Sequence, residues 1–145
     1  MAVSFTNNFK NILDQLRKVL RDEFKGALPV FVGHKTKEVG SQYIRLDPEG
    51  SELNEYNVNA ELREFTINMY FYYSDPNINE RALDQVLRFM SRIEALIHDN
   101  SSMTLTDSTN CFNCRIQTTE LNAIDDNNEY VVLLVWKGQH LGNTA

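Results

Sequence analysis

Two stretches of the sequence repeat their apolar residues at spacings of three and four, and each predicts an amphipathic helix. The first covers residues 5–24, and Ser4 is placed to cap its start. The second covers residues 77–99, where Asn77 is followed three residues later by a glutamate, as in a capping box. Asp75, which precedes a proline, offers an alternative cap. We expect each helix to bury its apolar stripe.

Alternation of apolar and polar residues predicts the strands. The pattern is most regular over residues 61–73, where one face is apolar and the other is polar or carries tyrosines. Shorter strands are expected at residues 29–33 and 41–47. Residues 112–121 and 129–137 predict a hairpin after the second helix. The last of these strands is apolar on both faces, which predicts a central strand or one that is buried on both sides.

The remaining segments are polar and are expected to connect these elements. Asp47 begins a turn-like run that opens a fourteen-residue connection over residues 47–60. Residues 100–110 predict a loop, and residues 138–145 predict a mobile C-terminal tail. Residues 1–137 are thus expected to form a single α+β domain. Its mainly antiparallel sheet has about four or five strands and two helices packed on one face, in the order α-β-β-α-β-β.

Composition is consistent with one ordinary domain and excludes several classes of protein. The chain has 145 residues, 42% of them hydrophobic, which suffices for one buried core. Its two cysteines cannot build the disulfide framework of a small secreted protein. No apolar run approaches the ~20 residues that span a bilayer, and no basic region followed by an apolar one opens the sequence. We therefore expect no membrane association, and a location in the cytosol or in a particle assembled there.

The net charge of −6 is unevenly divided along the chain. Residues 1–40 hold seven basic and four acidic residues, a balance of +3, which leaves −9 for residues 41–145. This polarity would suit head-to-tail contacts between copies, or a surface that repels a polyanion. The alternative is an ordinary scatter of charge over a solvated surface.

Candidate chemistry is sparse. Cys111 and Cys114 have the spacing of a redox pair or of half a zinc site, but no second pair or histidine cluster supplies further ligands. They also lie where a loop enters a strand, whereas a redox pair needs the start of a helix. Reduced cysteines packed in a strand are the favoured interpretation. The six glycines are spread singly, so no phosphate-binding loop is predicted. We predict no catalytic residue, no cofactor and no metal.

Two sets of residues remain as candidates for contacts or for a functional opening. The densest charge is an acidic run that could serve acid–base chemistry or bind a cation, although the calcium-loop pattern is absent and a solvated loop is favoured. The second set consists of tyrosines on the polar face of the long strand, which suit subunit contacts. Base stacking is less favoured because residues 66–73 contain no basic side chain. The candidates are Asp47, Glu49, Glu52, Glu55, Tyr70 and Tyr72.

The order of elements resembles that of the bacteriophage tail terminator (tail completion, or neck) proteins. The resemblance rests on Tyr43-Ile-Arg-Leu-Asp-Pro, Arg63-Glu-Phe-Thr-Ile-Asn-Met-Tyr-Phe-Tyr-Tyr, Glu80-Arg-Ala-Leu-Asp-Gln-Val-Leu and Tyr130-Val-Val-Leu-Leu-Val-Trp. It implies a virion protein that forms a hexameric ring on the tail tube, ends tail polymerisation and seats the head connector. It also implies contacts with the tube and sheath proteins, passage of genome DNA without specific binding, and assembly in the host cytoplasm. Head-closure and minor tail proteins share the pattern.

If the resemblance holds, the acidic segment has two possible roles. Residues 47–60 could pack on a neighbouring subunit, or they could line the ring opening, where carboxylates would repel passing DNA. Two other classes stay open from the residues alone. One is a monomeric or dimeric binding module with polar loops as its ligand surface, and the other is an enzyme that uses the acidic run with Cys111 and Cys114.

Overall fold

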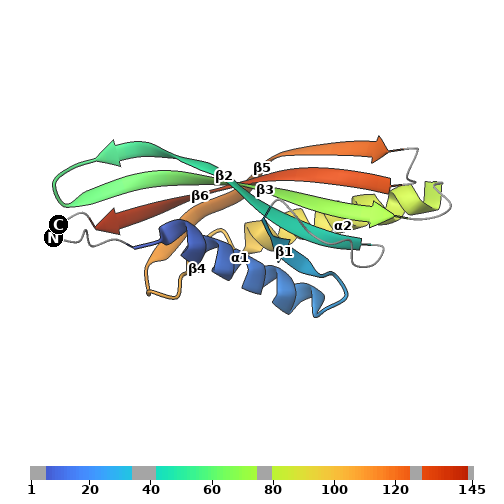
Figure 1. The fold of residues 1–145 in the computed structure, drawn as a ribbon, viewed down its shortest axis with the longest axis horizontal. Coiled ribbons are helices and arrows are strands. Elements are labelled where there is room, and N and C mark those ends of the chain that lie inside the picture. Colours follow the sequence, from blue (N-terminus) through green and yellow to red (C-terminus); the bar gives the residue numbers. More distant parts are fainter. Residues whose placement is uncertain (1–5, 34–41, 75–79, 125–128, 144–145) are drawn as a thin grey trace.

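The computed structural model describes residues 6–33, 42–74, 80–124 and 129–143. Within these ranges, two helices lie against one face of a six-stranded sheet whose strand order is β1-β2-β3-β6-β5-β4 (Figure 1). The elements in chain order are α1 (Asn8–Phe24), β1 (Val30–Val32), β2 (Gln42–Tyr56), β3 (Ala60–Ser74), α2 (Glu80–Asp99), β4 (Met103–Thr104), β5 (Asn110–Ile124) and β6 (Glu129–Asn143).

The α+β class is confirmed, but the sheet differs from the expected one. Over the described residues it has six strands instead of four or five, and the order is α-β-β-β-α-β-β-β. Four neighbouring pairs are antiparallel, whereas β1 runs parallel to β2, so the sheet is mixed. The additional strand β4 lies within the predicted loop 100–110 and has two residues. A two-residue segment is too short to show alternating polarity, so its sequence does not predict a strand. It is a strand because it pairs with β5.

The predicted connection 47–60 is wrong over residues 47–56, and the actual connection is limited to residues 57–59. Strand β2 continues to Tyr56 and pairs with β3 along its length, with register shifts between Pro48 and Gly50 and between Leu53 and Glu55. These register shifts lie beyond the part of β2 that pairs with β1, and they let the strand accommodate a proline and a glycine without ending. The segment does not alternate in polarity, because this part of the hairpin is exposed on both faces. The sequence pattern therefore resembled a loop.

The predicted tail is also wrong over residues 138–143. These residues continue β6 and pair with β3 from Phe65 back to Ala60. These residues form a strand because the long β3 provides backbone hydrogen-bond partners, which the sequence of the tail does not predict. Residues 144–145 lie outside the described residues.

Helix α1 starts three residues later than the pattern suggested. Its cap is Asn7 and not Ser4: the Asn7 side-chain oxygen accepts a hydrogen bond from the Lys10 backbone N–H at 3.1 Å. The helix ends at Phe24. The capping residue Lys25 has a left-handed backbone (φ 48°), and its N–H donates to the Arg21 carbonyl at 2.7 Å. The proposed caps of the second helix, Asp75 and Asn77, lie outside the described residues.

The core lies between the helices and one face of the sheet. Strand β6 is central, between β3 and β5, as predicted from its apolar sequence. Its Val132, Leu134 and Trp136 are fully buried against the helices, while the alternate residues are half-buried on the second face. In the described ranges, neither helix is both long and apolar enough to cross a membrane.

Candidate interaction surface

The second face of the sheet, which α1 and α2 do not cover, carries three of the candidates. Asp47, Tyr70 and Tyr72 alternate with core residues along β2 and β3, so their side chains point away from the helices. All three are half-buried. We call this surface the outer face.

A cation lies among the tyrosines of the outer face. The Arg45 guanidinium carbon is 4.6 Å from the centre of the Tyr70 ring and 5.9 Å from that of Tyr72. Tyr43 stacks on Tyr72 with ring centres 4.6 Å apart. Burial raises the pKa of the Tyr72 hydroxyl, and the Arg45 charge partly opposes this. Residues 66–73 contain no basic side chain, but the neighbouring strand places Arg45 directly opposite Tyr70.

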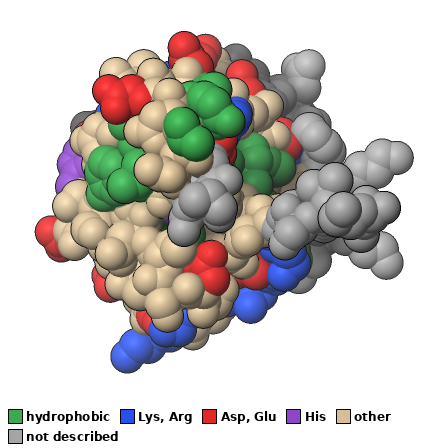
Figure 2. Space-filling view, turned by 90° about the vertical axis from the view of Figure 1, so that its left-hand side faces the viewer, with side chains coloured by type: hydrophobic (Ala, Val, Ile, Leu, Met, Phe, Trp, Pro, Cys, Tyr) green, Lys and Arg blue, Asp and Glu red, His purple; other side chains and the backbone are tan. Residues whose placement is uncertain are grey.

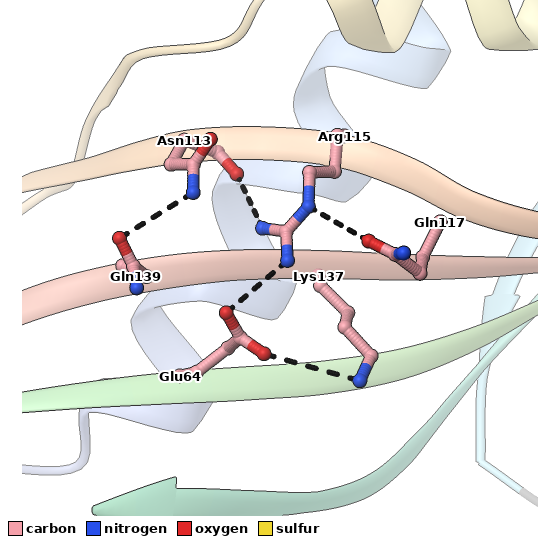
Figure 3. A network of polar contacts seen from close by, with 6 residues as sticks. All are labelled: Glu64, Asn113, Arg115, Gln117, Lys137 and Gln139. Atoms are coloured by element: carbon pink, nitrogen blue, oxygen red, sulfur yellow. Dashed lines mark hydrogen bonds and ion pairs between the residues drawn. The ribbon is translucent and has the colours of Figure 1, made fainter. Parts of the chain in front are cut away.

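A polar network continues the outer face along β3, β6 and β5 (Figure 3). Glu64 lies at its centre, with one carboxylate oxygen 3.2 Å from Arg115 and the other 3.9 Å from Lys137. Arg115 also donates to the Gln117 side chain and to the Asn113 carbonyl, both at 2.9 Å. The Glu64 side chain is only 17% exposed. This one carboxylate is shared by two cations, so the network ties β3 to both β5 and β6.

The structure separates the acidic candidates. Glu49 and Glu52 help to line a shallow depression of 430 Å³ that also contains Glu64 and Lys137. Asp47 lies instead near Arg45 in the sheet, and Glu55 lies further out on the hairpin. The predicted run of carboxylates is thus divided among three places, and Glu52 stands directly opposite Glu64.

Beyond the helices, the β2–β3 hairpin and the end of β6 form a projecting arm (Figure 1). Seen from this end, hydrophobic side chains lie at the surface among acidic ones (Figure 2). Four large apolar side chains are exposed there: Leu53 (45%), Tyr56 (67%), Val58 (83%) and Leu141 (57%). The sequence does not predict these exposed side chains, because single apolar residues among polar and acidic ones form no periodic pattern. We call residues 49–58 the hairpin end.

The cysteines lie on β5, away from these surfaces. Both are buried and free, with their sulfur atoms 3.6 Å apart. Their mutual hydrogen bond and burial raise the pKa of the Cys111 thiol. Within the described ranges, no three His, Cys, Asp or Glu side chains are arranged to hold a metal ion. The arrangement is that of packed strand residues.

Comparison with solved structures identifies the fold. The chain is similar to a chain from the virion of a native gene transfer agent particle, with a TM-score of 0.62 and 10% identity over 95% of this chain and 100% of that one. It is also similar to a second solved structure that carries no functional description, with a TM-score of 0.57 and 18% identity over 94% and 97%. No family model matches the sequence, and no curated protein matches it.

Proposed function

We propose that the chain is a structural protein of a phage-like virion, and specifically a tail terminator. In this role six copies form a ring on the last ring of the tail tube, stop its growth and seat the head connector. The observation that carries the proposal is a fold shared, over nearly the whole of both chains, with a component of a gene transfer agent virion.

The surface chemistry supports an assembly role. The outer face combines tyrosines with a stacked arginine, a composition that is enriched at protein interfaces. An arm with exposed apolar residues projects beyond the helices. Exposed apolar side chains gathered at one end of the molecule support a contact with another molecule there.

The proposal is tested by adding the purified chain to its cognate tail tube protein during polymerisation. We expect shorter tubes, and electron microscopy should show the chain at one end of each tube as a six-fold ring. Tube length should fall as the ratio of chain to tube protein rises.

Two outcomes would contradict the terminator role. Unchanged tube lengths with no end density would exclude it. Binding to the isolated head connector without binding to tubes would instead favour a head-closure protein.

A further inference from the structure

The hairpin end has one apolar and one acidic face. In the ladder with β3, Leu53 stands opposite Arg63 and Tyr56 opposite Glu61, which places both on the helix-side face of the sheet. The neighbours Glu52 and Glu55 point to the outer face. Residues 49–58 carry three glutamates and no basic residue. The cation opposite Leu53, Arg63, is itself paired with Glu61 at 3.6 Å. The hairpin end thus presents apolar side chains with a surplus of negative charge beside them.

A groove of complementary character lies elsewhere on the same chain. It has a volume of 320 Å³ between the end of α1 and β1, and its apolar lining includes Leu28, Pro29 and Phe31. Its basic residues are Arg21 and Lys25, both exposed. We call this the α1–β1 groove.

The positive charge of the groove is available to a partner. The two acidic residues nearest in sequence are engaged elsewhere, because Glu23 accepts from Arg92 at 2.9 Å and Asp22 pairs with Lys18 at 3.8 Å. Within the described part of the chain, Arg21 and Lys25 form no ion pair. Both lie in the +3 segment of the sequence, whereas the hairpin end lies in the −9 segment.

We infer that the hairpin end of one copy docks in the α1–β1 groove of the next copy. The occupant is a second copy because this chain carries both an apolar, acidic projection and an apolar, basic recess. The hairpin extends past the N-terminal end of α1, while the groove lies at its C-terminal end (Figure 1). A contact between two different surfaces repeats head to tail, and it closes into a ring when the rotation permits. The inference rests on the proposed function, for which it supplies the subunit contact.

Self-association is measured by sedimentation equilibrium of the full chain. Leu53→Ala and Tyr56→Ala are each expected to weaken association about tenfold, the loss typical of a buried anchor residue. The matched control is Leu87→Ala on α2, which removes a leucine of similar exposure (38% against 45%) outside both surfaces. Circular dichroism confirms that each variant is folded.

Charge reversal tests the pairing of the two surfaces. Glu52→Lys with Glu55→Lys, and separately Arg21→Glu with Lys25→Glu, should each reduce self-association by a similar factor. An equimolar mixture of the two reversed proteins should associate again, because each hairpin then meets a groove of opposite charge. Lys10→Glu with Arg88→Glu makes the same change in net charge as the groove variant, outside both surfaces, and should leave association unchanged.

Three results would overturn the inference. They are a wild-type chain that stays monomeric at millimolar concentration, a ring unaffected by the hairpin and groove variants, and reversed variants that do not rescue each other. None of these decides the proposed function, because a chain that caps tail tubes by another contact would still shorten them.

Discussion

At the scale of single residues, the fold depends on close contacts that the sequence pattern does not reveal. Gly138 pairs with Phe65 beside the fully buried Trp136. A Cβ atom at Gly138 would lie 2.5 Å from the nearest Trp136 ring carbon and 2.9 Å from the Cys111 sulfur. The polar sequence around Gly138 predicts a mobile tail, whereas the structure places this glycine against the core.

We predict that Gly138→Ala destabilises the protein by about 1–3 kcal/mol, the usual cost of overpacking a core. The free energy of unfolding, measured in urea, checks this. Gly50→Ala is the matched control, because a Cβ atom there meets nothing within 4 Å. Equal stability of the two variants would show that the Trp136 ring can move aside at little cost.

His140 links stability to pH. Burial lowers the pKa of its imidazole below the ordinary 6.5, while the carboxylates of Asp107 and Glu61 partly oppose this. The unfolded chain therefore takes up the proton more readily than the folded one. The stability due to neutral His140 is present above pH 6.5 and is lost as the pH falls below it.

We predict that the urea concentration at the unfolding midpoint of the wild type decreases when the pH is lowered from about 7.5 to about 5.5. This range spans the ordinary histidine pKa. In His140→Gln this fall should be smaller, because the buried group no longer titrates. His98→Gln removes an exposed histidine and keeps His140, so its midpoint should fall more than that of His140→Gln. A His140→Gln slope equal to that of the wild type would contradict the prediction.

At the scale of elements, the β2–β3 hairpin is held by its turn and by cross-strand pairs. The Asn57 side-chain oxygen accepts from the backbone N–H groups of Asn59 and Ala60 at 2.9 and 2.8 Å, which closes the turn. Further along the sheet, Glu64 joins Arg115 of β5 to Lys137 of β6. The outer face therefore has its own cross-strand support, independent of the helices.

Replacing Glu64 by alanine leaves two cations without their carboxylate. We expect a loss of about 1–2 kcal/mol in the free energy of unfolding, between the values typical of exposed and of buried ion pairs. Glu52→Ala on the opposite strand should be neutral or slightly stabilising, because it removes a like charge facing Glu64. If Glu64→Ala is as stable as Glu52→Ala, the network contributes nothing to stability.

At the scale of the whole molecule, the structure shows where the uneven charge of the sequence lies. The three glutamates of the hairpin end lie on a projecting arm, and Arg21 and Lys25 border a groove at the other end of α1. Association through these surfaces is in part electrostatic, so dissolved salt should weaken it.

We predict that self-association weakens several-fold when NaCl is raised from about 0.05 M to about 0.5 M, because the screening length shortens to a few ångströms. Sedimentation equilibrium at the two salt concentrations measures this. The variant Arg21→Glu with Lys25→Glu should not show this weakening, because its hairpin and groove repel each other, and salt screens that repulsion. Association that strengthens with salt in the wild type would point to a purely apolar contact.

The sequence by itself determined the features that depend on local periodicity. The two helices, the long strand β3 and the central place of β6 follow from residues such as Phe65, Ile67 and Trp136, whose spacing decides which face is buried. It also identified Tyr70 and Tyr72 as residues of a face apart from the core.

Only the tertiary structure decided the features that depend on pairing between distant segments. Residues 47–56 and 138–143 are strands because β3 offers them backbone hydrogen bonds, although their own side chains favour a loop and a tail. Arg45 of β2 contacts the ring of Tyr70 on the neighbouring strand. The register shifts of β2 separate the acidic side chains that follow one another in the sequence. Local patterns record which residues avoid water, whereas long-range pairing sets which residues meet, and the candidate surfaces are formed by that pairing.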